Sequence, residues 1–277
     1  MNDNLKKNLI AGFKSNKLAV AGLVMICILV VVSILAPLYP VDPNEMNASE
    51  MLQGPSLAHP FGTDNLGRDY LARCIYGGRV SLLIGFLAML LSTAIGVAVG
   101  TISGFVGGKV DVVLMRIVDA LMSIPTFLIM IVMNAYFSSG VTTVVLIIGF
   151  LSWMSTARIV RGETLSLKER DYVVYSRISG ESKGKIILRH IIPNTMPTII
   201  VSATINVAQA ILIESSLSFF GLGVVPPTAS WGTMLNVAQG YLTTQPYLAI
   251  FPGVLILLTV ISFNYLGEVL RNVYEPK

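Results

Sequence analysis

The side chains that could carry catalysis or bind a metal are few. The chain has two histidines, His59 and His190, and two cysteines, Cys27 and Cys74, and their spacing fits neither a catalytic constellation nor a metal site. Lys109 and the two glycines before it lack the upstream glycine and the following hydroxyl of a phosphate-binding loop. We therefore expect no catalytic residue, no metal ligand and no cofactor on this chain. If ATP is used, another chain binds it.

The most suggestive polar residues form a stripe. Ser202, Asn206 and Gln209 recur at helical spacing, and Ser216 falls on the same face two turns later. A water-filled pathway would explain this stripe, and hydrogen bonds between helices would explain it equally well. Glu214 lies in the same apolar block, where a carboxyl group is costly. It is either a gating or substrate-facing carboxylate or a carboxyl group hydrogen-bonded to a neighbouring helix. These five residues are the candidate pathway lining.

The composition places these residues in a membrane protein. Of the 277 residues, 54% are apolar and only 12% are charged, against about 25% charged residues in soluble domains. A soluble globular enzyme is nearly excluded. The formal net charge of +4 then favours the anionic inner face of a membrane over nucleic acid as the basic residues' partner.

Uncharged blocks predict six membrane-spanning helices. One crossing of the hydrocarbon core needs about 20 apolar residues. Two blocks exceed one crossing: one breaks at the small residues 137–140, and the other breaks at the glycines and prolines of 221–232. The predicted fold is therefore an all-α, polytopic membrane helix bundle. Its expected helices span 18–38, 80–108, about 112–136, about 141–159, 191 to about 220, and about 247–266.

The distribution of Lys and Arg predicts that both termini are cytoplasmic. Three of the 19 basic residues, Arg68, Arg73 and Arg79, lie in the expected outer segments, and the remaining sixteen lie in the expected inner ones. We thus divide the chain into a cytoplasmic segment 1–17, a first transmembrane helix 18–38, an extracytoplasmic segment 39–79 and a five-helix core 80–277. Within this core, 160–196 forms a cytoplasmic loop of short amphipathic helices on which a soluble partner could act.

Two further patterns concern how the helices pack. Gly96, Gly100, Gly104 and Gly108 recur every fourth residue, which leaves one helix face nearly bare for close packing or, alternatively, for sliding during transport. Arg116 and Asp119 are three residues apart, and we expect them to form an ion pair.

Three motifs resemble those of a known family, the inner-membrane permeases of ABC importers, and specifically the second permease of the dipeptide, oligopeptide and nickel group. They are HPFGTDNLGRDYLAR at 59–73 followed by IYGGRVSLLIG at 75–85, then SLSFFGLG at 216–223 with PPTASWG at 226–232, and NYLGEVLR at 264–271. The likeness covers essentially the whole chain, and it implies the type I permease fold in a bacterial plasma or inner membrane.

The resemblance also implies an ATPase-docking loop. Its sequence here is DYVVYSRISG at 171–180, then IILRHIIPN at 186–194, where the group more often has Glu-Ala-Ala in place of Val174, Tyr175 and Ser176. An apolar face of Tyr172, Val173, Val174 and Ile178 would seat in a groove of the ATPase, and Gly180 would end the helix. The alternative is an amphipathic segment resting on lipid headgroups. The expected docking residues are Asp171, Tyr172, Val173, Val174, Tyr175, Ser176, Gly180 and Pro193.

The family implies four partners besides the lipid membrane: a second, non-identical permease, two ATP-binding subunits that hold ATP and Mg²⁺, and an extracytoplasmic substrate-binding protein. This chain would form half of a pathway for dipeptides or oligopeptides, or alternatively for nickel or a metal chelate. A membrane scaffold or receptor that moves no solute is the alternative from a different class. We expect no nucleic acid partner.

Overall fold

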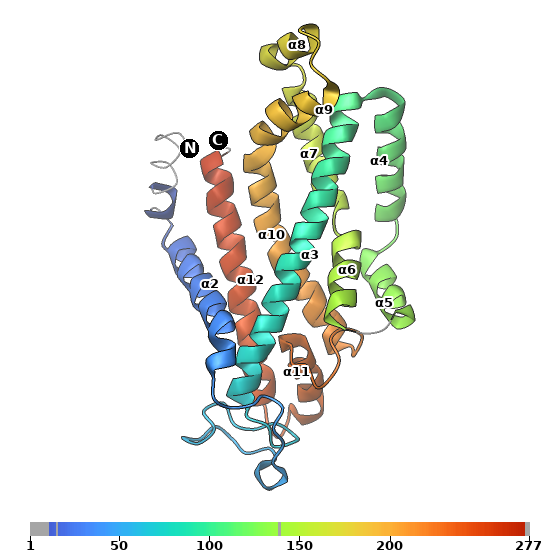
Figure 1. Cartoon of the computed structure of the whole chain (residues 1–277). Helices are drawn as coiled ribbons and strands as arrows, with labels where there is room; N and C mark the ends of the chain where they lie inside the picture. Colours follow the sequence, from blue (N-terminus) through green and yellow to red (C-terminus); the bar gives the residue numbers. More distant parts are fainter. Residues whose placement is uncertain (1–10, 15, 138–139, 275–277) are drawn as a thin grey trace.

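The computed structural model describes residues 11–14, 16–137 and 140–274 of the chain. Within these residues the regular structure is helical apart from one isolated bridge between Thr63 and Asp69, in agreement with the predicted all-α class. Long helices run side by side, and shorter helices gather at both ends of the bundle (Figure 1). The predicted segment 1–17 lies mostly outside the described residues, as do Ser138 and Ser139 of the predicted turn.

Five helical spans of the described chain are long and apolar enough to cross a membrane. They are Lys17–Leu38 with α2 (Lys17–Leu35), Tyr70–Val106 (α3), Val141–Leu167 with α6 (Val141–Leu151) and α7 (Met154–Leu167), Lys183–Phe219 with α9 (Lys183–Ile186) and α10 (Ile192–Phe219), and Tyr247–Tyr274 (α12). A bent pair, α4 (Gly108–Met122) and α5 (Thr126–Tyr136), passes the test together, so the described chain has five such spans, or six if this pair counts as one broken span.

The second span begins ten residues earlier than the predicted residue 80. Asp69 caps α3 by accepting a hydrogen bond from the backbone N–H of Ala72, so the helix starts at Tyr70. Arg73 is inside the helix and buried, and its guanidinium is satisfied by Asp64 and by the backbone of Pro43. A charged residue that is paired in this way does not interrupt a helix, so the loop that was predicted to cover 39–79 ends at Asp69.

The predicted single helix over 112–136 was wrong. The structure has two helices, α4 and α5, whose axes are bent by 79° at Ser123–Pro125. Pro125 lacks a backbone N–H, and its ring disfavours the helical conformation of the residue before it, so the helix ends ahead of it. Two other spans run past their predicted ends, to Leu167 in α7 and to Tyr274 in α12, because polar residues continue the last turns.

Helix α3 lies at the centre of the bundle and contacts α7, α10 and α6. Gly96, Gly100 and Gly104 face α7 so closely that a Cβ atom on Gly100 would lie 2.5 Å from the carbonyl oxygen of Ala157. The glycine face is thus used for close helix packing in this structure. The fourth member of the pattern, Gly108, has open space around its Cα and a φ of +56°, so it starts α4 and does not extend this contact.

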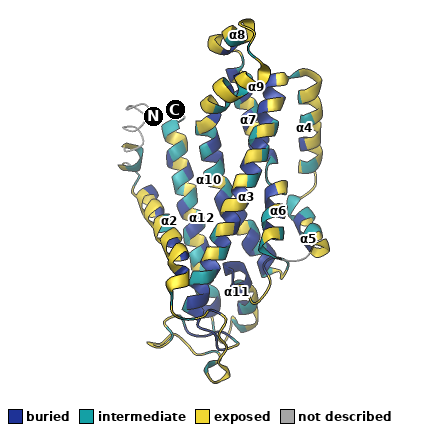
Figure 2. Ribbon diagram, viewed as in Figure 1, coloured by how far each residue is buried: buried dark blue, intermediate teal, exposed yellow. Residues whose placement is uncertain are grey.

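The two ends of the bundle differ in construction (Figure 1). One end, here called the loop end, carries residues 39–69 and α11 (Trp231–Ala238). The other end, here called the α8 end, carries α8 (Asp171–Ile178) and α9, together with the start of α2 and the end of α12. Figure 2 shows that the exposed surface includes the outward faces of α2 and α4, whose exposed residues are mostly apolar, as expected of helices that face lipid.

Candidate functional site

Helix α8 projects from the bundle and is held by one buried side chain. Val173 is fully buried in a cluster with Phe105 of α3, Leu167 of α7, and Ile186 and Ile191 ahead of α10. The guanidinium carbon of Arg177 lies 5.6 Å from the centre of the Phe105 ring and adds a cation–π contact to the same cluster. The helix is therefore seated on the ends of three long helices.

The exposed face of α8 differs from the predicted one. Tyr175 and Ile178 are 73% and 80% exposed, and Tyr172 is 41% exposed. Val173 points inward and cannot seat in a partner's groove, because it fills the cluster beneath the helix. Because Val173 is buried, it cannot be part of the docking face. The apolar face available to a partner consists of Tyr172, Tyr175 and Ile178.

The other predicted docking residues surround this face. Asp171 is exposed in the first turn of α8, Val174 is half-buried, and Pro193 is exposed in the first turn of α10. The Ser176 hydroxyl donates to the carbonyl oxygen of Tyr172 and lies 3.2 Å from His190 Nε2. Gly180 has a φ of +79°, in the left-handed region that favours glycine, and it follows the end of α8 as predicted.

Glu181 stabilises the turn that follows α8. Its Oε1 lies 3.1 Å from Lys185 Nζ and 3.9 Å from Arg189 Nη1, and its Oε2 lies 3.5 Å from His190 Nε2. The hydrogen bond from Lys185, followed by the charges of Lys185, His190 and Arg189, lowers the pKa of the Glu181 carboxyl group despite some desolvation. The turn between α8 and α10 is thus fixed by one carboxylate among several cationic groups.

Two of the five candidate pathway residues share a small polar hollow. Asn206 and Gln209 of α10 line a cavity of about 180 Å³ whose other polar side chains are those of Thr126, Ser152 and Ser155. Gln209 is exposed, and the Asn206 amide donates to Thr156 Oγ1 at 3.1 Å. The hollow lies where α4 bends into α5 and α6 gives way to α7, so the breaks in two spans create it.

The other three candidates lie elsewhere. Ser202 is buried, and Ser216 is half-buried with its hydroxyl donating to the carbonyl oxygen of Leu212. Glu214 is completely buried and does not line the hollow, although Ile213 before it does. Of the two alternatives for Glu214, this conformation fits the carboxyl group hydrogen-bonded to a neighbouring helix and not the gating or substrate-facing carboxylate.

Glu214 joins three elements through serine hydroxyls. Ser81 of α3 donates to Oε2 at 3.0 Å, and Ser218 donates to Oε1 at 2.8 Å. Ser81 also accepts the backbone N–H of Trp231, the first residue of α11, and the Trp231 indole N–H donates to the carbonyl oxygen of Cys74. The SLSFFGLG and PPTASWG motifs thus form one packed corner at the loop end.

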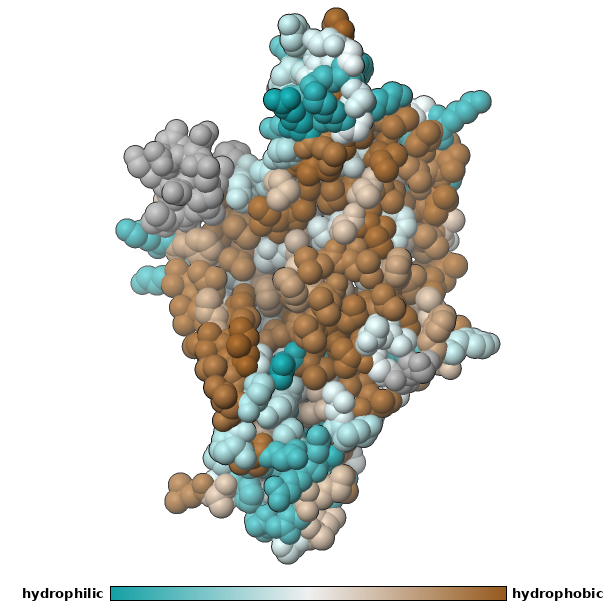
Figure 3. Space-filling model, viewed as in Figure 1, coloured by the Kyte–Doolittle hydropathy of each residue, from teal (hydrophilic) through white to brown (hydrophobic). Residues whose placement is uncertain are grey.

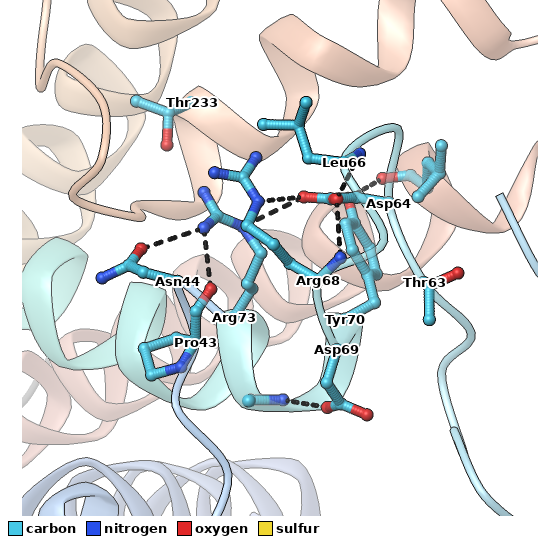
Figure 4. Close-up of polar contacts among 12 residues, drawn as sticks. Pro43, Asn44, Thr63, Asp64, Leu66, Arg68, Asp69, Tyr70, Arg73 and Thr233 are labelled. Atoms are coloured by element: carbon cyan, nitrogen blue, oxygen red, sulfur yellow. Dashed lines mark hydrogen bonds and ion pairs between the residues drawn. The ribbon is translucent and has the colours of Figure 1, made fainter. Parts of the chain in front are cut away.

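The motif at 59–73 folds as a cap around Asp64 (Figure 4). Asp64 accepts from the backbone N–H groups of Leu66 and Arg68 and from Arg68 Nε at 2.7 Å, and Arg73 Nε lies 3.5 Å away. Arg73 also donates to the carbonyl oxygen of Pro43, which holds the earlier part of the loop. A nearly buried carboxylate that is shared by two buried guanidiniums fixes the loop on the bundle.

The same cap is joined to α12 by Tyr247. The Tyr247 hydroxyl contacts the carbonyl oxygens of Gln53 and Thr63, at 2.9 and 2.8 Å. Gly62 lies against the Tyr247 ring with a φ of +76°, so a side chain at this position would be strained and would collide with the ring. His59 Nδ1 lies 2.9 Å from Asp69 Oδ2. The residue types in this motif are therefore accounted for by the structure of the loop.

The predicted pair between Arg116 and Asp119 was wrong. Asp119 instead accepts from Arg158 Nη2 of α7 at 2.5 Å. A second pair that sequence reasoning missed lies nearby: Arg161 holds Asp111 with two hydrogen bonds, of 2.5 and 2.6 Å, and Ser103 donates to the same carboxylate. Both pairs tie α4 to α7.

Sequence reasoning also missed Thr126, Ser152 and Ser155 in the hollow. Pro125 was the local signal for the bend that brings Thr126 there, whereas the two serines lie in an apolar block whose break carries no proline or glycine. Among the described residues, no group of three or more His, Cys, Asp and Glu side chains could hold a metal ion.

The fold and these sites define a class: a multi-pass membrane helix bundle with a helix exposed at one end and a fixed loop cap at the other. Residues 96–277 match the family model of the binding-protein-dependent transport system inner membrane component, and residues 7–55 match the N-terminal TM domain of oligopeptide transport permease C. The chain belongs to this family of inner-membrane permease components, which are transporter subunits and not enzymes.

Several relatives match nearly the whole chain. An oligopeptide transport system permease of Bacillus subtilis is 40% identical over 99% of this chain and 90% of its own length. The oligopeptide and dipeptide transport permeases of Haemophilus influenzae are 39% and 38% identical over 96% of this chain, and the matches cover 86% and 92% of their lengths.

Proposed function

We propose that this chain is one permease subunit of an ATP-driven importer of dipeptides or oligopeptides. The observation that carries this proposal is the match along 99% of the chain to a relative named as an oligopeptide permease. The subunit would pair with a second, non-identical permease, and a binding protein would deliver the peptide at the loop end. Two ATPase subunits would hold ATP and Mg²⁺ and act at the α8 end. The excess of Lys and Arg in the segments at that end supports a cytoplasmic location for it.

The exposed face of α8 is the proposed contact with an ATPase subunit. Tyr172, Tyr175 and Ile178 present an apolar surface on a helix that is seated through Val173. A helix that lays such a face into a groove is a common mode of recognition. Because Tyr175 and Ile178 make no contribution to the buried cluster, they can be replaced without removing the seat of the helix.

Asn206 and Gln209 are the proposed contacts with the moving peptide. A peptide backbone offers N–H and C=O groups, and a carboxamide side chain can donate to one and accept from the other. Delivery by a binding protein requires only weak contacts of this kind along the pathway. We do not assign a pathway role to Glu214, because its carboxylate is enclosed by serine hydroxyls.

The primary experiment is uptake by cells that lack this gene. A labelled dipeptide and nickel at nanomolar concentration are compared, with the intact gene restored as the control. We expect loss of dipeptide uptake with unchanged nickel uptake. Loss of nickel uptake alone would contradict the peptide assignment and favour the metal alternative. Loss of neither would favour the scaffold alternative.

Two pairs of variants then test the sites. Replacing Tyr175 and Ile178 together with Ala should abolish co-purification of the ATPase, whereas Leu57→Ala, which alters an even more exposed residue at the loop end, should leave it intact. Gln209→Leu should reduce peptide uptake with normal assembly, whereas Ser216→Ala, on the same stripe but outside the hollow, should not. Equal effects within either pair would contradict the assignment of that site.

A further inference from the structure

A long apolar groove runs along the flank of the bundle between α2, α3, α10 and α12. Its volume is about 740 Å³, and its lining includes Val30 and Ile34 of α2, Phe86 and Met89 of α3, Val207 of α10 and Phe263 of α12. It lies apart from the hollow at Asn206 and from α8. The surface over these helices is mostly apolar (Figure 3), so the groove opens toward the lipid-facing side of this chain.

A second, smaller hollow continues the groove toward the loop end. Its volume is about 320 Å³, and it is lined by Asn44 of the loop, Tyr76 of α3 and Thr228 ahead of α11. The two hollows share Arg79 and Leu83. Together they form one elongated site whose outer part is more polar than the rest of its length, with a guanidinium at the junction.

Arg79 lacks a carboxylate partner within the described part of the chain. The two neighbouring arginines of the cap, Arg68 and Arg73, are buried and share Asp64, whereas Arg79 is exposed and forms no ion pair with a described residue. It lies nine residues into a membrane-spanning helix, or about 14 Å from the start of that helix. A cation near this end of a membrane helix can reach the headgroup level, where the phosphates of anionic lipids are available to it.

The dimensions of the groove match one leaflet of a bilayer. Arg79 and Met89 are ten residues apart on α3, which corresponds to about 15 Å along the helix. Half of a hydrocarbon core of about 30 Å has the same length. A molecule that places an anion at Arg79 and an alkyl chain along the groove would therefore extend from the headgroup level to the middle of the bilayer.

We propose that this groove holds one anionic phospholipid, with its phosphate on Arg79 and an acyl chain along α3 between α2 and α10. A phospholipid carries an anion and a long alkyl chain in one molecule, and so complements both hollows at once. The charge-assisted hydrogen bonds between phosphate and guanidinium are among the stronger ones in proteins.

The test measures retained lipid on the full-length chain. The protein is reconstituted in nanodiscs of phosphatidylglycerol and phosphatidylethanolamine, released into mild detergent and weighed by native mass spectrometry. We expect wild type and Arg79→Lys to retain one phosphatidylglycerol, and Arg79→Gln to retain it about tenfold more weakly. Ala203→Phe, which narrows the groove without altering charge, should weaken retention as well.

Arg116→Gln is the matched control, because Arg116 is another exposed arginine of a membrane helix, on α4 away from the groove. Equal retention of phosphatidylglycerol by Arg79→Gln and Arg116→Gln would overturn the proposal. A photoreactive residue in place of Leu83, which borders both hollows and is 47% exposed, provides a second measurement in membranes. Adducts with lipid would support the proposal, and adducts with another polypeptide would overturn it.

Discussion

Replacing Gly100 with alanine should separate α3 from α7. A Cβ atom at this position would lie 2.5 Å from the carbonyl oxygen of Ala157, 2.9 Å from Cβ of Val160 and 3.0 Å from the backbone nitrogen of Arg161. Two of these three atoms belong to the backbone of α7 and cannot rotate away, so the helices must move apart. All three distances are at or below 3.0 Å, and dispersion contacts along the interface would be lost as well.

The expected cost is about 2 kcal/mol in the free energy of unfolding. Overpacking a close-packed interior costs about 1–3 kcal/mol, and we take the upper end because backbone atoms are involved. Alanine in place of glycine in a helix returns about 1 kcal/mol. The unfolding equilibrium should therefore shift roughly 30-fold.

The assay is reversible unfolding of the purified chain in mixed detergent micelles at increasing SDS. The matched control is Gly162→Ala, because Gly162 lies on α7 with open space around its Cα and should tolerate alanine or gain slightly from it. We expect a lower midpoint for Gly100→Ala and an unchanged or higher one for Gly162→Ala. Indistinguishable midpoints for the two variants would refute the packing argument.

Three further outcomes follow from the contacts described above. A double-mutant cycle of Asp111→Asn and Arg161→Gln, measured by the same unfolding assay, should give a coupling energy of about 1–2 kcal/mol, and additivity would contradict the bidentate pair. The pKa of the Glu181 carboxyl group is lower in the folded state, so its stabilisation of the α8 turn should be present above the unfolded-state pKa and lost as pH falls through the folded-state pKa. Hydrogen exchange of this turn should become faster over that pH range. The Glu181→Gln variant should not show this pH dependence. Ser230→Ala removes the capping box of α11 and should destabilise the protein by about 1 kcal/mol, a shift that would be absent if solvent satisfied the cap.

Five of the six predicted spans could be located from the sequence because apolar block length is a local property, and the sixth corresponds to the bent pair of α4 and α5. The start of α3 could not be predicted, because a charged residue such as Arg73 indicates a loop when its partner, Asp64, cannot be identified from the sequence. Pro125 was a usable local signal for the bend between α4 and α5. The pair between Asp111 and Arg161 had no such signal, since fifty residues separate the partners and only the fold brings them together.

The sequence predicted more about the position of the candidate sites than about which side chains face inward. The position of α8 and the glycine after it followed from the resemblance, but the side that faces inward did not, because Tyr172, Val173 and Val174 are all apolar or aromatic in a helix of two turns. For the polar stripe, helical spacing grouped Asn206 with Gln209 correctly. Whether Glu214 faces water or serines depends on Ser81 of α3, which lies 133 residues away in the sequence.

The seat of α8 has a mechanical consequence. The Val173 side chain is surrounded by residues from the ends of α3 and α7 and from the segment leading into α10. A close-packed cluster has low compressibility, so a load on α8 cannot be absorbed locally by deforming the joint. The joint acts as a stiff three-way coupling, and a push or torque on α8 is divided at once among three membrane-length spans: α3, α10 and the span made of α6 and α7.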